Sequence, residues 1–144
     1  MERKTFIKTC GFACLGGLIG NTLLSGCAST KIVDATIIDT NLVLPEAAFR
    51  EAQNSYKNYV VVENARLKYP ICVFRKSATE YTAVYMYCTH QGAQLQVFGD
   101  RLECPAHGSQ FSNSGEVKTG PAETALRTFP IIIQNNQLYI SLLK

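Results

Sequence analysis

Residues 88–92 read CTHQG, and residues 104–109 read CPAHGS. These two segments, called box 1 and box 2 below, contain both histidines of the 144-residue chain. Gly or Pro lies within each box, which is typical of tight loops rather than of helix or strand interiors. Two cysteine thiolates and two neutral imidazoles suit a soft or borderline metal. The sequence therefore predicts a metal centre with four ligands, Cys88, His90, Cys104 and His107.

The patterns of the two boxes, C-x-H-x-G and C-P-x-H-G-S, resemble the signature of the Rieske [2Fe–2S] proteins. The resemblance implies one cluster per chain, with one iron held by the two cysteines and the other by the two histidines. Two ferric ions, two sulfides, two thiolates and two neutral imidazoles carry no net charge, whereas a cluster with four cysteines is negatively charged. The neutral centre accepts an electron more easily, so its potential is expected between roughly −150 and +300 mV, against about −400 mV for four-cysteine ferredoxins.

A structural zinc ion is the alternative interpretation of the same ligand set. Zinc sites more often pair a C-x₂₋₄-C segment with an H-x₃₋₅-H segment, so that each segment carries one kind of ligand. Both boxes here mix Cys with His, and box 2 ends in Gly-Ser. The pattern therefore favours the iron–sulfur cluster.

Several neighbours of the predicted ligands have roles that the resemblance implies. Gly92 and Gly108 would let the backbone approach the sulfides without a Cβ atom in the way. Ser109 would donate a hydrogen bond to a bridging sulfide and so raise the potential. Phe111 stands where high-potential respiratory members have a tyrosine whose hydroxyl bonds a cysteine sulfur. Thr119-Gly120-Pro121-Ala122 is similar to the family's proline loop, which shields the cluster, but an ordinary turn has the same composition.

The respiratory members also carry a disulfide between the two boxes, and the corresponding positions here are Ala93 and Ala106. This centre thus lacks the tyrosine and the disulfide of the respiratory type but keeps the serine, Ser109. We therefore expect an intermediate potential. The spacer between the boxes, residues 91–103, is shorter than in many members of the family, which predicts a short hairpin there.

The first 26 residues are interpreted as an export signal rather than as part of the fold. Arg3 and Lys4 begin a basic segment, and an uncharged, Gly-rich apolar stretch extends from Cys10 to about Leu24. The start resembles a twin-arginine signal, with Lys4 in place of the second arginine and residues 6–8, FIK, matching the rest. Such a signal suits a protein whose cluster is assembled before export.

Residues 24–27 read LSGC and resemble a bacterial lipobox. The resemblance implies cleavage before Cys27, a diacylglycerol group on its sulfur, and stable anchoring by several acyl chains. An uncleaved transmembrane helix is the alternative, but the apolar stretch is about 16 residues long, short of the roughly 20 that span a bilayer. We therefore expect a signal at 1–26, a folded domain at 27–144, and lipid anchoring on the periplasmic side of a bacterial membrane.

Charge and cysteine counts agree with this division. The chain has 14 basic and 11 acidic residues, and because residues 1–26 hold three of the basic ones and one acid, the remainder is nearly neutral. No basic run follows position 26, so nucleic-acid binding is not expected. With two cysteines in the signal, Cys27 lipidated and two on iron, Cys72 has no disulfide partner. It is expected to be buried in a strand around residues 71–74, ICVF.

Short β-rich segments separated by turn residues make up residues 27–144, the length of one domain. Candidate strands are 31–39, 58–63, 69–75, 81–87, 93–98, 101–104, 109–111, 126–133 and 137–142, with hairpin turns at Gly99-Asp100 and Asn135-Asn136. A helical turn is expected within 45–52. The sequence predicts an all-β, antiparallel sandwich or barrel. The resemblance adds a Rieske-type base sheet and a small cluster-binding subdomain with both boxes on adjacent loops.

The function expected from these observations is one-electron transfer, with a redox protein or quinol as donor or acceptor. The chain would act as a free-standing carrier or as the small subunit of a periplasmic oxidoreductase. The iron–sulfur subunit of a cytochrome bc-type quinol oxidase is an alternative, although residues 28–30 leave little room for a swinging hinge. A zinc-stabilised β-domain that binds a partner is a remote third. Oxygenase activity of the chain by itself is not expected, because its mononuclear iron would need two further histidines.

Overall fold

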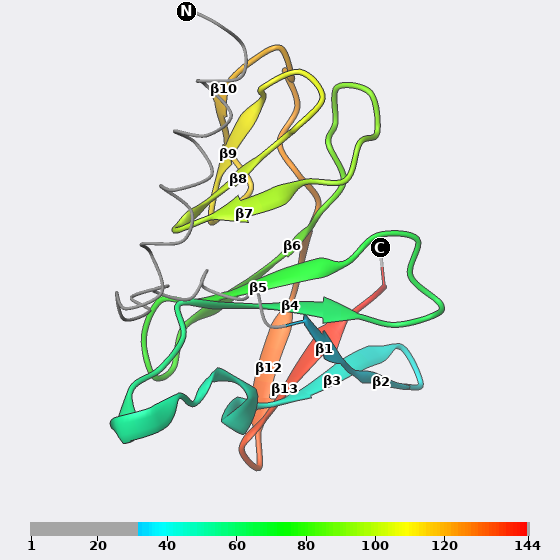
Figure 1. Cartoon of the computed structure of the whole chain (residues 1–144). Helices are drawn as coiled ribbons and strands as arrows, with labels where there is room; N and C mark the ends of the chain where they lie inside the picture. The colour runs from blue at the N-terminus through cyan, green and yellow to red at the C-terminus, as the bar shows by residue number, and fades with distance from the viewer. Residues whose placement is uncertain (1–31, 144) are drawn as a thin grey trace, which may run out of the picture.

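The computed structural model describes residues 32–143, which form three β-sheets. The central sheet has the strand order β1-β4-β5-β6-β11, the base sheet β12-β13-β3-β2, and the distal sheet β10-β9-β8-β7. The base and distal sheets lie at opposite ends of the molecule with the central sheet between them (Figure 1). The prediction of an all-β fold is confirmed.

The elements follow one another along the chain with short connections. They are β1 (Ile32–Asp34), β2 (Thr36–Ile38), β3 (Asn41–Pro45), η1 (Glu46–Phe49), η2 (Ala52–Asn54), β4 (Tyr59–Glu63), β5 (Ile71–Arg75), β6 (Tyr81–Tyr85), β7 (Gln96–Phe98), β8 (Arg101–Glu103), β9 (Gln110–Ser112), β10 (Val117–Thr119), β11 (Thr128–Phe129), β12 (Ile131–Gln134) and β13 (Gln137–Ser141). The two short helices, η1 and η2, are of the 3₁₀ type. The predicted helical turn within 45–52 corresponds to η1.

The central sheet is apolar on both faces because the side chains of its inner strands alternate between two cores. Along β4, Val60 and Val62 enter one core while Val61 enters the other. Along β5, Val73 and Phe74 divide in the same way. Alternation with a period of two is imposed by strand geometry, and a sheet covered on both faces needs apolar residues at consecutive positions. The central sheet is therefore the shared wall between a base core and a distal core.

The base core lies between the central and base sheets. β3 and β13 pair antiparallel and contribute Leu42, Leu44, Leu138 and Ile140, all fully buried. Phe49 at the end of η1 is also fully buried, with its ring edge-on to that of Tyr81 at 5.2 Å between centroids. Full burial of each such side chain contributes about 1.5–3 kcal/mol to stability. This core supports the central sheet from the side away from the two boxes.

The distal core lies between the central and distal sheets and contains the cysteines of both boxes. Cys88 and Cys104 pack there with Leu95, Leu102 and Phe111. The distal core thus holds the two boxes against the central sheet by apolar contacts.

Two predicted strands are split where the chain passes from the central sheet to the base sheet. The segment 31–39 breaks at Ala35, whose N–H donates to Glu63 O and whose carbonyl accepts from the Asn64 side chain. The segment 126–133 breaks at Pro130, which has no N–H for a ladder and whose carbonyl accepts from Ser141 N. Because β1 and β11 belong to one sheet and β2 and β12 to the other, both corners are needed to join the sheets.

The sequence prediction missed two strands and one pairing direction. β3 and β10 were not expected, although β3 lies in the middle of the base sheet. β1 pairs with β4 in parallel, with Ile32 opposite Val61, so the expectation of a purely antiparallel fold is wrong at this edge. Parallel pairing arises because the chain leaves β1, builds two strands of the base sheet, and returns to the central sheet in the same direction.

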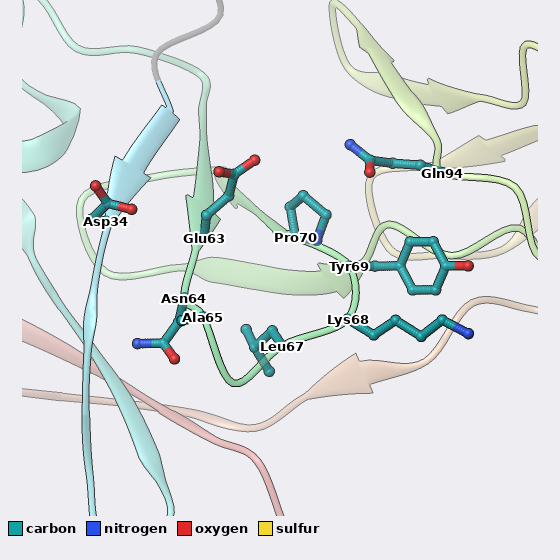
Figure 2. A pocket seen from close by; sticks show the side chains of 9 residues that line it. All are labelled: Asp34, Glu63, Asn64, Ala65, Leu67, Lys68, Tyr69, Pro70 and Gln94. Carbon is teal, nitrogen blue, oxygen red and sulfur yellow. The ribbon is translucent and has the colours of Figure 1, made fainter.

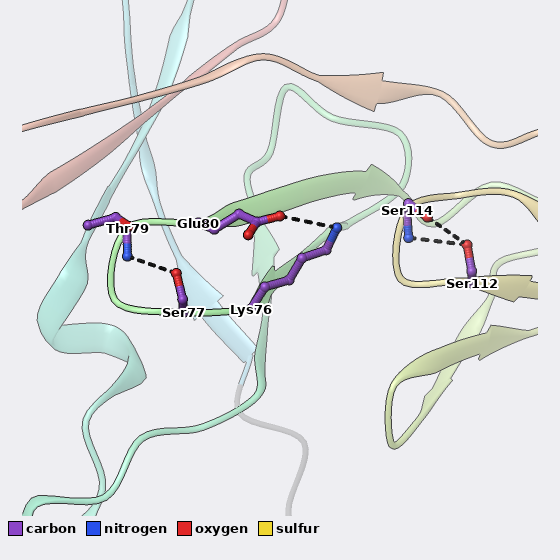
Figure 3. Close-up of polar contacts among 6 residues, drawn as sticks. All are labelled: Lys76, Ser77, Thr79, Glu80, Ser112 and Ser114. Atoms are coloured by element: carbon purple, nitrogen blue, oxygen red, sulfur yellow. Dashed lines mark hydrogen bonds and ion pairs between the residues drawn. The ribbon is translucent and has the colours of Figure 1, made fainter.

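Tight turns close the hairpins. Asn135 and Asn136 both have positive φ, as expected for the predicted two-residue turn between β12 and β13, and Gly99 has φ +64° in the turn between β7 and β8. Figure 3 shows two further turns: Lys76 pairs with Glu80 between β5 and β6, and the Ser112 hydroxyl bonds Ser114 between β9 and β10. Among residues 32–143, no helix is long and apolar enough to span a bilayer.

Candidate metal centre

Both boxes form the tips of hairpins, and their backbones close in the same way. In box 1, Cys88 N donates to Ala93 O at 2.9 Å, and Gly92 N donates to Cys88 O at 2.9 Å. In box 2, the equivalent bonds join Cys104 N to Ser109 O at 2.8 Å and Gly108 N to Cys104 O at 2.9 Å. The two loops therefore have equivalent backbone closures, although His lies two residues after Cys in box 1 and three residues after it in box 2.

Gly92 and Gly108 occupy equivalent places and have φ angles of +78° and +77°. In this left-handed region a side chain costs roughly 1–2 kcal/mol, so the backbone explains both glycines. Their surroundings differ: a Cβ on Gly92 would lie 3.1 Å from the Tyr87 ring, whereas a Cβ on Gly108 would meet no described atom within 4 Å. The backbone conformation therefore favours glycine at both positions, and at Gly92 the nearby Tyr87 ring also leaves little room for a side chain.

The two cysteine sulfurs are buried next to each other. Cys88 and Cys104 are 1% and 2% exposed, and their side chains are close enough to influence each other's pKa. Burial raises the pKa of the Cys88 thiol, although N–H groups of His90 and Gln91 donate to its sulfur and oppose this effect. Burial also disfavours the Cys104 thiolate, but the N–H groups of His107 and Ala106, helped by the Cys88 thiol, lower its pKa. Backbone N–H donors at equivalent positions thus point at both sulfurs.

The two histidines form a second pair at the surface. His90 and His107 are exposed, and their rings are perpendicular with centroids 4.9 Å apart. Within residues 32–143, no group of three or more His, Cys, Asp and Glu side chains is arranged to hold a single metal ion. The four predicted ligands are instead brought together as one buried thiol pair and one exposed imidazole pair.

The loop between β10 and β11, residues 120–127, lies against both boxes. The fully buried Ser109 of box 2 accepts a hydrogen bond from Ala122 N at 3.0 Å. Thr89 of box 1 donates through its hydroxyl to Thr124 O at 2.6 Å. Pro121 is exposed and follows a cis peptide bond. We call this segment the proline loop, because it contains Pro121 and bonds both boxes.

The remaining residues singled out from the sequence are placed as follows. Phe111 on β9 is fully buried in the distal core together with the two box cysteines. Cys72 is fully buried on β5, as predicted, and burial raises the pKa of its thiol. Ala93 is half-buried and Ala106 is exposed. Cys27 and the export signal lie outside the described residues.

Sequence reasoning missed three residues that support box 1. Thr89 was regarded only as the spacer between Cys88 and His90, yet it bonds the proline loop. Tyr69 donates from its hydroxyl to Gly92 O at 2.8 Å, and the Tyr87 ring lies against Gly92. Tyr69 is 23 residues from its acceptor in the sequence, so no local pattern could have indicated this contact.

A model of the Rieske [2Fe-2S] domain matches residues 39–130, well over half of the chain. The chain is 29% identical over 63 residues to a cytochrome b6-f complex iron-sulfur subunit of Chlorobaculum tepidum, covering 42% of this chain and 35% of that protein. It is similarly 34% identical over 56 residues to such a subunit of Prochlorococcus marinus, covering 38% of this chain and 32% of that protein. The chain spans about a third of the length of these curated relatives.

A solved structure supports the same family. The cyanobacterial plasma membrane Rieske protein PetC3 from Synechocystis PCC 6803 superposes with a TM-score of 0.51 at 26% identity, covering 58% of this chain and 86% of that one. The fold and the two paired loops thus define an iron–sulfur protein of the Rieske type. The chain belongs to the Rieske [2Fe-2S] domain family, and its cofactor is a [2Fe–2S] cluster.

The donor set fits this cofactor. A Rieske cluster needs two thiolates for one iron and two neutral imidazoles for the other. The structure presents a thiol pair and an imidazole pair on two loops with equivalent closures. Backbone N–H groups oppose the effect of burial at both sulfurs, so that the pKa of Cys104 is lowered while burial still raises that of Cys88.

Proposed function

We propose that this chain carries one electron at a time through a [2Fe–2S] cluster held by Cys88 and Cys104 on one iron and by His90 and His107 on the other. The observation that carries the proposal is the pairing of the two boxes, which joins two buried thiols and two exposed imidazoles at one end of the molecule. A cluster with these ligands takes up and releases a single electron without bond rearrangement.

The two cysteines are buried and the two histidines are exposed, and each pair has a different role in the proposed electron transfer. Cys88 and Cys104 belong to the distal core, so apolar side chains exclude water from the thiolate side. His90 and His107 are exposed, so a donor or acceptor can approach the imidazole side. The proline loop closes a further side through its bonds to Ser109 and Thr89. Electron exchange is therefore expected through the imidazole face.

The Ser109 hydroxyl has a proton left to donate. It accepts from Ala122 N, and a hydroxyl has one O–H donor in addition to its acceptor lone pairs. With the cluster bound, this proton would be available to a sulfide of the cluster, where it would favour the reduced, more negative state and raise the potential. Phe111 offers no hydroxyl to a cysteine sulfur, so the potential stays below that of the respiratory type.

We further propose that the protein works on the periplasmic side of a bacterial membrane, held there by lipid on Cys27. The lipobox at 24–27 and the export signal before it support this placement, and β1 begins at Ile32, only a few residues beyond Cys27. The donor or acceptor is then a redox protein or a quinol in or near that membrane. Mass spectrometry of the membrane form tests this point, because a diacylated N-terminal Cys27 supports it and an intact residue 1 contradicts it.

A second candidate function is favoured by the relatives, which are named as subunits of the cytochrome b6-f complex. In that case the chain would be the iron–sulfur subunit of a quinol-oxidising complex rather than a separate carrier. Reduction of the cluster by quinol in native membranes, abolished by an inhibitor of the quinol site, would favour the subunit. Reduction that is insensitive to the inhibitor would favour the separate carrier.

The ligand assignment is tested by comparing four single variants with one control. Cys88→Ala, His90→Ala, Cys104→Ala and His107→Ala should each lose the visible absorption and the acid-labile sulfide of the purified protein. Cys72→Ala is the matched control, because Cys72 is equally buried but lies on β5 and should keep two irons and two sulfides. A colourless wild-type protein with one zinc would refute the proposal and support the zinc-stabilised β-domain.

A further inference from the structure

Tyr69 lies outside both boxes, on the connection between β4 and β5, but it contacts box 1 directly. Its hydroxyl donates a 2.8 Å hydrogen bond to the carbonyl oxygen of Gly92. Figure 2 shows its side chain near Gln94, with the hydroxyl directed away from Asp34 and Glu63. Tyr69 also lines the pocket drawn there, and none of the four predicted ligands is among the residues that line it.

The Tyr69 ring is held in place by other aromatic rings. It lies 5.1 Å from the ring of Tyr87 and 5.8 Å from that of Tyr85, edge-on to the latter. Tyr85 in turn contacts Phe129 of β11 at 5.9 Å. Aromatic pairs at these separations are attractive beyond the area that they bury. The Tyr69 ring is therefore packed against β6 of the central sheet through Tyr85, while its hydroxyl bonds box 1.

Gly92 is held from two directions. Tyr69 bonds its carbonyl, and the Tyr87 ring lies 3.1 Å from the position that a Cβ would take. Gly92 N donates to Cys88 O, and the carbonyl of the next residue, Ala93, accepts from Cys88 N, so two hydrogen bonds join this end of the loop to Cys88. A shift of Gly92 would thus be transmitted to Cys88 at the other end of box 1.

Box 2 is supported differently. Its glycine, Gly108, has no described atom within 4 Å of a Cβ position, and its Ser109 bonds the proline loop rather than the central sheet. The aromatic support therefore acts on one of two otherwise equivalent loops. This asymmetry is the observation on which the inference rests.

We propose that Tyr69 is a positioning residue that sets the geometry of box 1, and through it the orientation of His90 relative to His107. The inference rests on the proposed function, because it assumes that box 1 supplies Cys88 and His90 to the cluster. Tyr69 acts on the cluster through the loop and does not touch it.

The test compares Tyr69→Phe with Tyr139→Phe in the full-length, cluster-containing protein. Both substitutions remove the hydroxyl of a half-buried tyrosine that donates a hydrogen bond, but Tyr139 lies on β13 and bonds Gln137 in the base sheet. Three quantities are measured: the g values of the reduced cluster by electron paramagnetic resonance, the rate of iron loss to a chelator, and amide exchange across residues 88–95. A thermal melt of each variant reports the fold.

Tyr69→Phe is expected to shift the g values, to speed iron loss roughly fivefold, and to speed exchange in box 1, because one net hydrogen bond is lost there. Tyr139→Phe should leave all three unchanged. The inference is overturned if the two variants behave alike, or if Tyr69→Phe melts far below Tyr139→Phe, since Tyr69 would then be needed for folding in general. A wild-type protein without the cluster signal would refute the proposed function instead, while amide exchange would still test the contact of Tyr69 with box 1.

Discussion

Replacing Ser109 with Ala removes one fully buried oxygen that accepts a hydrogen bond from Ala122 N and that, in the proposed function, also donates one to the cluster. The Ala122 N–H loses its acceptor at 3.0 Å, and Ala122 is only 3% exposed, so water cannot easily replace the hydroxyl. Leaving a buried N–H without a partner costs about 1–3 kcal/mol. The proline loop should therefore open more often, and the Ala122 amide should exchange about 5–150 times faster by the same free energy.

The same substitution should lower the midpoint potential. Hydrogen bonds to a charged acceptor are roughly twice as strong as neutral ones, so the hydroxyl is expected to favour the reduced cluster by about 1.4 kcal/mol. For a one-electron couple this corresponds to a fall of about 59 mV on substitution. A redox titration followed by electron paramagnetic resonance measures the potential, and amide exchange measures the proline loop.

Ser112→Ala is the matched control for both measurements. Ser112 is three residues further along and also accepts backbone N–H groups, from Ser114 at 3.3 Å and Glu116 at 3.1 Å, but these bonds serve the β9–β10 turn. This control should leave the potential and the Ala122 amide unchanged. A potential that stays constant in Ser109→Ala, or that falls equally in Ser112→Ala, would show that the Ser109 hydroxyl does not act on the cluster.

Three further predictions concern single residues around the boxes. Phe111→Tyr should raise the midpoint potential if its new hydroxyl reaches a cysteine sulfur, and a redox titration showing no rise would contradict this, since Phe111 already packs with both cysteines. Thr89→Ala should speed iron loss to a chelator by about fivefold, because box 1 loses its 2.6 Å bond to the proline loop; an unchanged rate would count against it. Gly92→Ala should lower the melting temperature of the holoprotein, and it should do so by less in a Tyr87→Ala background, because the new Cβ would lie 3.1 Å from the Tyr87 ring. An equal loss in both backgrounds would contradict the contact.

Local patterns predicted much of the fold because the period-2 alternation and the turn residues are local properties. The strands β4, β5, β6 and β13 were located to within two residues at each end, and both predicted hairpin turns are present. Three of the failures share one cause. The splits at Ala35 and Pro130 and the parallel pairing of β1 occur where the chain changes sheets, and a change of sheet depends on partners distant in the sequence.

In the candidate site, too, local features could be predicted from the sequence and contacts between distant residues could not. Cys88, His90, Cys104 and His107 were indicated by two segments of five and six residues, because the ligands of each loop must lie close together in the sequence. Tyr69 and the bond between Thr89 and Thr124 could not be indicated, because each joins positions more than 20 residues apart. The pairing of the two boxes was an expectation until the structure brought the two loops together.

The sequence by itself determined the class of this protein. The order and spacing of Cys and His in two Gly- and Pro-rich segments indicate the chemistry, because zinc sites with the same ligand types usually group the two cysteines and the two histidines in separate segments. The tertiary structure alone decided which donors are buried and which are exposed, since Cys88 and Cys104 enter the distal core while His90 and His107 reach the surface. It also decided what supports each loop: Tyr69 and Tyr87 hold box 1, and Ser109 ties box 2 to the proline loop. Burial and long-range hydrogen bonds arise only when sheets pack together, so no spacing within either box could reveal them.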